Sequence, residues 1–223
     1  MTRLAGLMAL LLAVSPLAAA DAPKWGVQWE TADPPTELKP AIRALLADRA
    51  LRVTDSAGAY GTLWLRKDLP AKTAADRGKT GLTYRAIAPA AVIGAVQFEK
   101  PWVDYRQQEI PAGVYTLRLA IQPASKDHEG TAPHREFCIL SPAAQDATAA
   151  EMPLKKLIAL SSEITGGTHP LVMMLAPNPT PDAKPAIADS GKSIIALSVK
   201  WHVKVGEMNE DIGFAFVLAN PVP

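Results

Sequence analysis

The feature that most constrains the fold is a strict alternation of side chains just after the turn Ile110–Gly113. Tyr115, Leu117 and Leu119 alternate with Thr116 and other residues of a second, more polar face. Residues two apart in an extended strand point to the same side, so the alternation predicts a β-strand with one apolar face. A polar loop and a second apolar run follow. We therefore predict that segments 110–121 and 135–140 are neighbouring antiparallel strands, joined by a long connection over 122–133.

Short apolar runs separated by turn residues recur along most of the chain, and one of them predicts a strand over 82–87. Segment 178–191 has four proline or glycine residues and is expected to be a mobile excursion. Helical spacing is found in two places only: after Pro40, where Ile42, Leu45 and Leu46 share a face, and over Glu151–Ile164, before the glycines at 166 and 167. Because strands do not alternate regularly with helices, the pattern predicts a mainly β protein. The expected architecture is an antiparallel β-sandwich or a jelly-roll-like domain with one or two short helices.

The expected core consists of apolar residues on the inward faces of the strands and of the second helix. It contains Val53, Leu63, Leu65, Tyr115, Leu117, Leu119, Ile139, Leu157, Val172, Leu197, Val199, Trp201, Phe214 and Phe216.

The first 20 residues have the pattern of a secretory signal peptide. Arg3 provides a positive start, an apolar run covers Leu4–Val14, and three alanines precede Asp21. We expect residues 21–49 to form a lead-in with a short helix and residues 50–223 to form the β domain. The predicted location is the periplasm or the extracellular space, with no integral membrane segment after cleavage of the signal.

The net charge and the cysteine content argue against a nucleic-acid-binding protein and against a disulfide-stabilised one. Removing residues 1–20 takes away Arg3 and no acidic residue, so the 23 basic and 22 acidic residues become 22 and 22. A neutral protein has no bulk electrostatic reason to bind nucleic acid. Cys138 is the only cysteine, so no internal disulfide can form and stability has to come from the core.

The segment Asp127–Cys138 is the first candidate site. His134, Glu136 and Cys138 are two residues apart and would project together from a strand, and His128 could add a donor from the loop. Imidazole, carboxylate and thiolate all bind transition metals. The alternative is structural: Cys138 is buried, Glu136 pairs with a base such as Arg118, and the histidines are solvated. No cofactor is expected unless this segment binds a transition metal.

Aromatic residues provide the second candidate site. Trp25, Trp29, Trp64, Trp102, Tyr105 and Trp201 could form a platform on which sugar rings stack, or they could fill the ends of the core. Trp201 lies in the apolar alternation of its strand, which favours the core. We expect Trp102 and Tyr105, together with the loop residues Asp127 and His128, to contact a ligand.

Two segments resemble a family of short exported bacterial proteins that is described only as a domain of unknown function. They are IPAGVYTLRLAI, over 110–121, and the terminal ALSVKWHVKV, over 196–205. The resemblance covers about 25 residues and implies a β-sandwich without an assigned activity. It assigns no functional residue.

These observations favour a non-catalytic binding or structural module over an enzyme. The sequence has no G-x-S-x-G, H-E-x-x-H or P-loop motif. Polar loops on a β scaffold are a common site of recognition. The expected ligand is a glycan or an envelope protein, and the choice between them is open. The alternative function is a metal-binding protein, or a metal-dependent enzyme or redox protein, that uses the Asp127–Cys138 segment.

Overall fold

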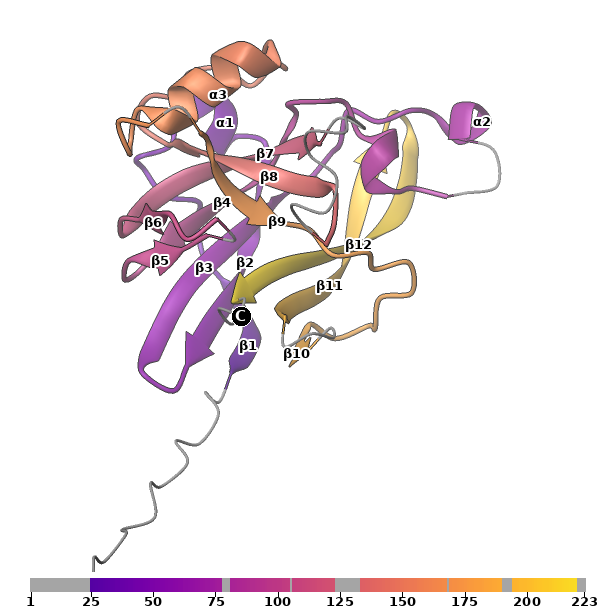
Figure 1. Ribbon diagram of the computed structural model, residues 1–223. Coiled ribbons are helices and arrows are strands. Elements are labelled where there is room, and N and C mark those ends of the chain that lie inside the picture. Colours follow the sequence, from indigo (N-terminus) through magenta and orange to yellow (C-terminus); the bar gives the residue numbers. More distant parts are fainter. Residues whose placement is uncertain are drawn as a thin grey trace, which may run out of the picture.

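The structure is a computed structural model that describes residues 25–77, 81–104, 106–122, 133–167, 169–189 and 194–219. Strands dominate, and every strand pair is antiparallel, which confirms the predicted mainly β class. Two sheets pack face to face in a sandwich-like arrangement (Figure 1). None of the described helices is long and apolar enough to span a bilayer.

The larger sheet has seven strands in chain order, apart from one small excursion. They are β1 (Gly26–Thr31), β2 (Leu46–Asp55), β3 (Gly58–Arg66), β4 (Val92–Phe98), β7 (Gly113–Ile121), β8 (Glu136–Pro142) and β9 (Leu171–Met174). The excursion is the short hairpin of β5 (Trp102–Val103) and β6 (Glu109–Ile110). Because neighbouring strands follow one another along the chain, this sheet is a meander, and of the two predicted architectures the sandwich applies.

The smaller sheet is formed by β10 (Ala186–Asp189), β11 (Ile195–Val205) and β12 (Met208–Ala219). It covers one face of the large sheet, while the helices α1 (Pro40–Arg43) and α3 (Leu154–Ser162) lie on the opposite face (Figure 1). A third helix, α2 (Ala74–Arg77), and a 3-10 turn, η2 (Tyr84–Ala86), lie in the connection between β3 and β4.

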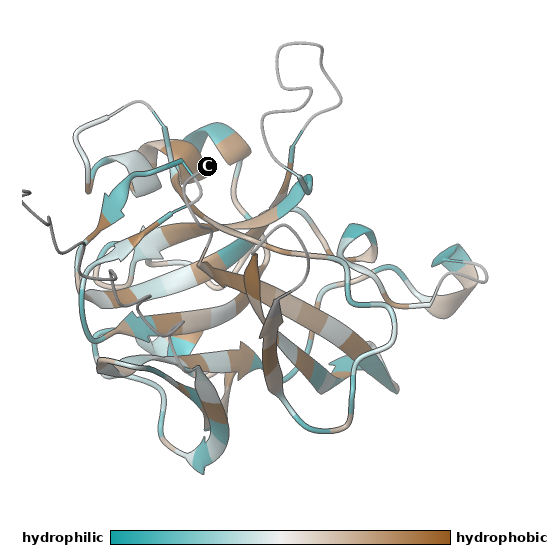
Figure 2. Ribbon diagram, turned by 60° about the horizontal axis from the view of Figure 1, so that its bottom comes forward, coloured by the Kyte–Doolittle hydropathy of each residue, from teal (hydrophilic) through white to brown (hydrophobic). Residues whose placement is uncertain are grey.

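The main core lies between the two sheets, and all of the predicted core residues are buried. Figure 2 shows hydrophobic residues concentrated along the strands of both sheets, with hydrophilic residues at many of the turns. Smaller apolar clusters lie on the outer face of the large sheet, one with Ile42 of α1 and one with Leu157 of α3. The large sheet is therefore buried on both faces over much of its area.

Tight turns set the register of the hairpins. In the β2–β3 turn, the Asp55 carboxylate accepts a hydrogen bond of 2.8 Å from the backbone N–H of Ala57, and Gly58 has a φ of +107°. The β11–β12 turn places Gly206 at a φ of +60°. A positive φ is accessible to glycine without a steric penalty, so both turns suit their sequences. The predicted pairing of segments 110–121 and 135–140 is confirmed as β7 against β8.

Three local predictions were wrong. The first helix ends at Arg43, and Leu46 onward is strand, because β2 pairs with both β1 and β3. The expected strand over 82–87 contains the turn η2. The expected mobile excursion over 178–191 contributes β10 to the small sheet. For β2 and β10, pairing with neighbouring strands overrides the local pattern. The segment expected as a lead-in contributes β1, an edge strand of the large sheet.

Candidate functional site

Part of the first predicted site lies outside the described residues. This applies to Asp127 and His128, and Tyr105 of the second predicted site also lies outside them. Among the residues that the structure describes, no group of three or more His, Cys, Asp or Glu side chains could hold a metal ion. His134 is described and is half-buried just before β8. The predicted metal site that includes His128 therefore remains a prediction.

Cys138 and Glu136 have different environments although they lie on one face of β8. The Cys138 thiol is fully buried in the main core, and this burial raises its pKa, so it is held as the neutral thiol. Metal ligation requires the thiolate, which makes Cys138 a poor ligand. Glu136 forms an ion pair of 2.8 Å with Arg85. As the structural alternative expected, Cys138 is buried and Glu136 pairs with a base. That base is Arg85 and not Arg118.

Trp102 does not offer an exposed ring. It is 8% exposed, it stacks on Phe98 with ring centroids 5.1 Å apart, and its indole N–H donates to the Leu218 carbonyl over 2.7 Å. Tyr60 donates to the same carbonyl, also over 2.7 Å. These two donors fix the end of β12 against the large sheet. The prediction that Trp102 contacts a ligand on the surface is therefore wrong, because the ring fills the core.

Two other tryptophans are also structural. Trp64 and Trp201 are buried and donate their indole N–H groups to the carbonyls of Ala32 and Arg66. The placement of Trp201 in the core was predicted correctly. Trp25 is half-buried and meets Tyr60 edge to face, with centroids 5.0 Å apart.

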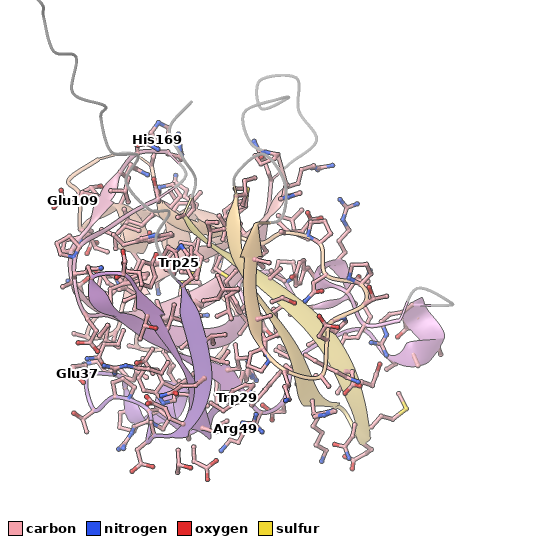
Figure 3. The ribbon with its side chains drawn as sticks, turned by 90° about the horizontal axis from the view of Figure 1, so that it is seen from below. Trp25, Trp29, Glu37, Arg49, Glu109 and His169 are labelled. Atoms are coloured by element: carbon pink, nitrogen blue, oxygen red, sulfur yellow. The ribbon has the colours of Figure 1, made fainter. Side chains whose placement is uncertain are left out.

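One aromatic feature at the surface is a cluster of three side chains, Trp29, Arg49 and Trp201, which we call the Trp29 cluster. The Arg49 guanidinium carbon lies 3.7 Å from the Trp29 ring centroid and 5.5 Å from that of Trp201. The two indole rings stack with centroids 5.7 Å apart. Arg49 is exposed and Trp29 half-buried, and Figure 3 shows the two side by side at one end of β1. The cluster thus joins both sheets at the margin of the sandwich.

The regular pairing of β2 with β1 accounts for the position of Arg49, although the pairing of β2 with β3 is irregular nearby. Leu46 pairs with Arg66 and Ala50 pairs with Trp64, so three residues of β2 face one residue of β3. A bulge of this kind bends a strand and redirects its side chains. Pairing with β1 continues through the bulge, with Arg49 opposite Thr31. Arg49 therefore lies diagonally across from Trp29 on the same face, within reach of the ring.

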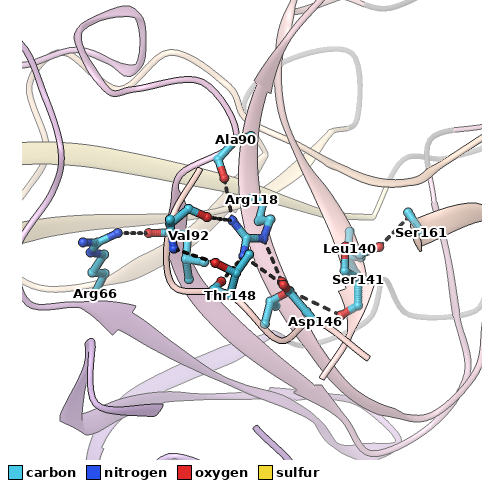
Figure 4. A network of polar contacts seen from close by, with 11 residues as sticks. Arg66, Ala90, Val92, Arg118, Leu140, Ser141, Asp146, Thr148 and Ser161 are labelled. Carbon is cyan, nitrogen blue, oxygen red and sulfur yellow. Dashed lines mark hydrogen bonds and ion pairs between the residues drawn. The ribbon is translucent and has the colours of Figure 1, made fainter. Parts of the chain in front are cut away.

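A buried ion pair on the outer face of the large sheet was not predicted from the sequence. Arg118 and Asp146 are both completely buried and bond bidentately, with Nε–Oδ2 at 2.7 Å and Nη2–Oδ1 at 2.8 Å. Arg118 also donates to the carbonyls of Ala90 and Thr148, as Figure 4 shows, and to the carbonyl of Ala150. Its sequence signal was an arginine in the middle of an otherwise apolar strand.

This network has no capacity left for chemistry on a ligand. All five guanidinium N–H groups have acceptors, and Asp146 also accepts a hydrogen bond of 2.5 Å from the Thr116 hydroxyl. A pocket of about 260 Å³ lies between α3 and residues 145–152, and Asp146 is part of its lining. Because its carboxylate is already bonded, the pair anchors the 143–152 segment to the sheet and is structural.

Asp104 has a similar role at the β5–β6 hairpin. It is 2% exposed and accepts hydrogen bonds from the backbone N–H groups of Arg106, Gln108 and Val172. A carboxylate that accepts several backbone hydrogen bonds stabilises a turn. The bond to Val172 ties this hairpin to β9.

Comparison of the chain with protein-family models, with curated proteins and with solved structures finds no match. The resemblance to a family of exported bacterial proteins remains a prediction.

Proposed function

We propose that this protein is an exported, non-catalytic binding module of the bacterial envelope or the extracellular space, and that its ligand is a glycan. The observation that carries the proposal is the Trp29 cluster, in which an exposed guanidinium lies over an indole ring at the margin of a two-sheet scaffold. Aromatic side chains contact the apolar C–H groups of sugar rings, here at the edge of the Trp29 indole, and guanidinium N–H groups donate to sugar oxygens.

The use of the other polar groups supports binding over catalysis. The Arg118–Asp146 pair, Asp104 and Cys138 are buried and hold the fold together. A catalytic acid, base or nucleophile needs access to a substrate. Arg49 is accessible, and an arginine whose charge is permanent suits recognition better than proton transfer.

The distribution of exposed apolar side chains supports a glycan rather than a protein partner. Among the described residues the exposed large hydrophobic side chains are Val103, Leu154 and Met208, which lie on β5, α3 and β12. Protein interfaces usually have a contiguous apolar core. Three separate side chains do not provide one.

The test is binding of the purified protein to a panel of soluble neutral and acidic polysaccharides, measured by retardation in native affinity gels. The wild type is expected to be retarded by at least one polymer, and Trp29→Ala should abolish the retardation. Val103→Ser, which removes an exposed apolar side chain on β5, is the matched control and should behave as the wild type. Failure of the wild type to bind any polymer would refute the proposal.

A further inference from the structure

Resting on the proposed function, we propose that the glycan is acidic and that Arg49 binds a uronate carboxylate of the sugar. The argument begins with the way the guanidinium is held. Stacking on indole uses the face of the guanidinium plane and leaves the N–H groups, which lie in that plane, directed outward. The Arg49 guanidinium carbon lies over the Trp29 ring, 3.7 Å from its centroid, a distance that suits such a stack.

Arg49 has no counter-charge among the described residues. It forms no ion pair there. Most other described arginines donate from their guanidinium to a carboxylate, a hydroxyl or a carbonyl: Arg43, Arg52, Arg66, Arg77, Arg85, Arg118 and Arg135. Arg106 is the other described exception, and it has no aromatic partner. Arg49 is therefore ordered by the rings while its hydrogen-bonding capacity is unused.

This arrangement suits a carboxylate. A guanidinium presents two parallel N–H donors that match the two oxygens of a carboxylate, and such charge-assisted pairs are stronger than neutral hydrogen bonds. Because stacking already restricts the side chain, less conformational entropy is lost when the ligand binds. The nearest acidic residue on β1, Glu30, is adjacent to Trp29 in a strand and so points to the opposite face.

The second half of the recognition comes from the rings. A uronate sugar carries its carboxylate directly on a ring that also has an apolar C–H face. Trp29 lies against the guanidinium, so one sugar unit can contact the indole edge while its carboxylate meets Arg49. A neutral sugar would lack the charge-assisted bond between its carboxylate and Arg49, which predicts selectivity for acidic glycans.

The experiment compares polygalacturonate and alginate with the same two polymers after esterification of their carboxyl groups, in native affinity gels. The protein is expected to bind at least one acidic polymer, with affinity at least 10-fold weaker for its ester. Arg49→Gln should weaken binding of the acidic polymer about 10-fold and leave binding of the ester unchanged. Arg106→Gln is the matched control, since it removes an exposed, unstacked arginine, and should have no effect. Raising the salt concentration should weaken the wild type more than Arg49→Gln, because salt screens an exposed ion pair.

Each outcome is decisive. Equal binding of an acidic polymer and its ester would overturn the acidic ligand while supporting the proposed glycan function. Binding only to neutral polymers of the larger panel would do the same. Loss of selectivity in Arg106→Gln as well as in Arg49→Gln would assign recognition to general charge and overturn the role of Arg49. Binding of no polymer would refute both proposals. Thermal melting of Arg49→Gln should match the wild type within a few degrees, which separates loss of binding from loss of folding.

Discussion

The buried pair Arg118–Asp146 allows a quantitative prediction about stability. Asp146→Asn preserves the shape of the side chain and removes its charge, which leaves the Arg118 guanidinium buried without a counter-ion. Breaking a buried ion pair from one side typically costs about 3–5 kcal/mol. The carboxylate accepts three hydrogen bonds at 2.5–2.8 Å from Arg118 and Thr116, so we expect the upper part of this range.

Two further variants divide this cost. Thr116→Val removes one hydrogen bond to the carboxylate and should cost about 1.5–3 kcal/mol, the usual range for a hydrogen bond to a charged group. Arg118→Met leaves Asp146 unpaired and also leaves the carbonyls of Ala90, Thr148 and Ala150 without their donor. Arg118→Met should therefore be more destabilising than Asp146→Asn.

Urea unfolding followed by tryptophan fluorescence is the appropriate assay. With a denaturant slope of about 2 kcal/mol/M, a loss of about 4 kcal/mol lowers the unfolding midpoint by about 2 M. The control is Asp211→Asn, which breaks the exposed Lys200–Asp211 pair and should cost about 1 kcal/mol or less. If Asp146→Asn shifts the midpoint no more than the control does, the assignment of Arg118–Asp146 as a structural pair is wrong.

Two other predictions concern close packing and buried ionisable groups. Gly213→Ala should destabilise the folded protein by about 1–3 kcal/mol, because a Cβ there would lie 2.0 Å from the Asn178 carbonyl oxygen. Lys200→Ala, opposite Gly213 on the paired strand, should have a small effect. Equal urea midpoints for the two variants would contradict this prediction. Burial raises the pKa of the Cys138 thiol and of the Tyr60 and Tyr84 hydroxyls, so these groups stay neutral in the folded state while they ionise in the unfolded chain. Stability from this source is complete below the ordinary pKa values of about 8.5 for cysteine and about 10 for tyrosine, and it falls as the pH rises above them. The melting temperature should therefore decline between pH 7 and pH 11, and the decline should be shallower in Tyr60→Phe. The native protein should not react with a thiol reagent at pH 8. Rapid labelling of Cys138 would instead show that the thiol is accessible.

The candidate site was only partly accessible to prediction from the sequence. The placement of Glu136 and Cys138 on one face of a strand follows from the two-residue period and is seen in β8. The period does not show which face is covered, so the exposed role expected of Trp102 was wrong. The β1–β2 pairing that brings Arg49 beside Trp29 has no local signal, because it joins two separate segments of the chain.

The sequence by itself determined the class of fold, the central strand pair β7–β8 and the residues of the core. These depend on the alternation of apolar side chains within single strands and on turn residues, which are local properties. The tertiary structure alone decided which polar residues are buried and which exposed residues meet. In the sequence, Arg118 lies on the polar face of a strand. It is buried only because the 143–152 segment folds over it and supplies Asp146. The Trp29 cluster combines strands from both sheets, so it exists only after the sheets have packed.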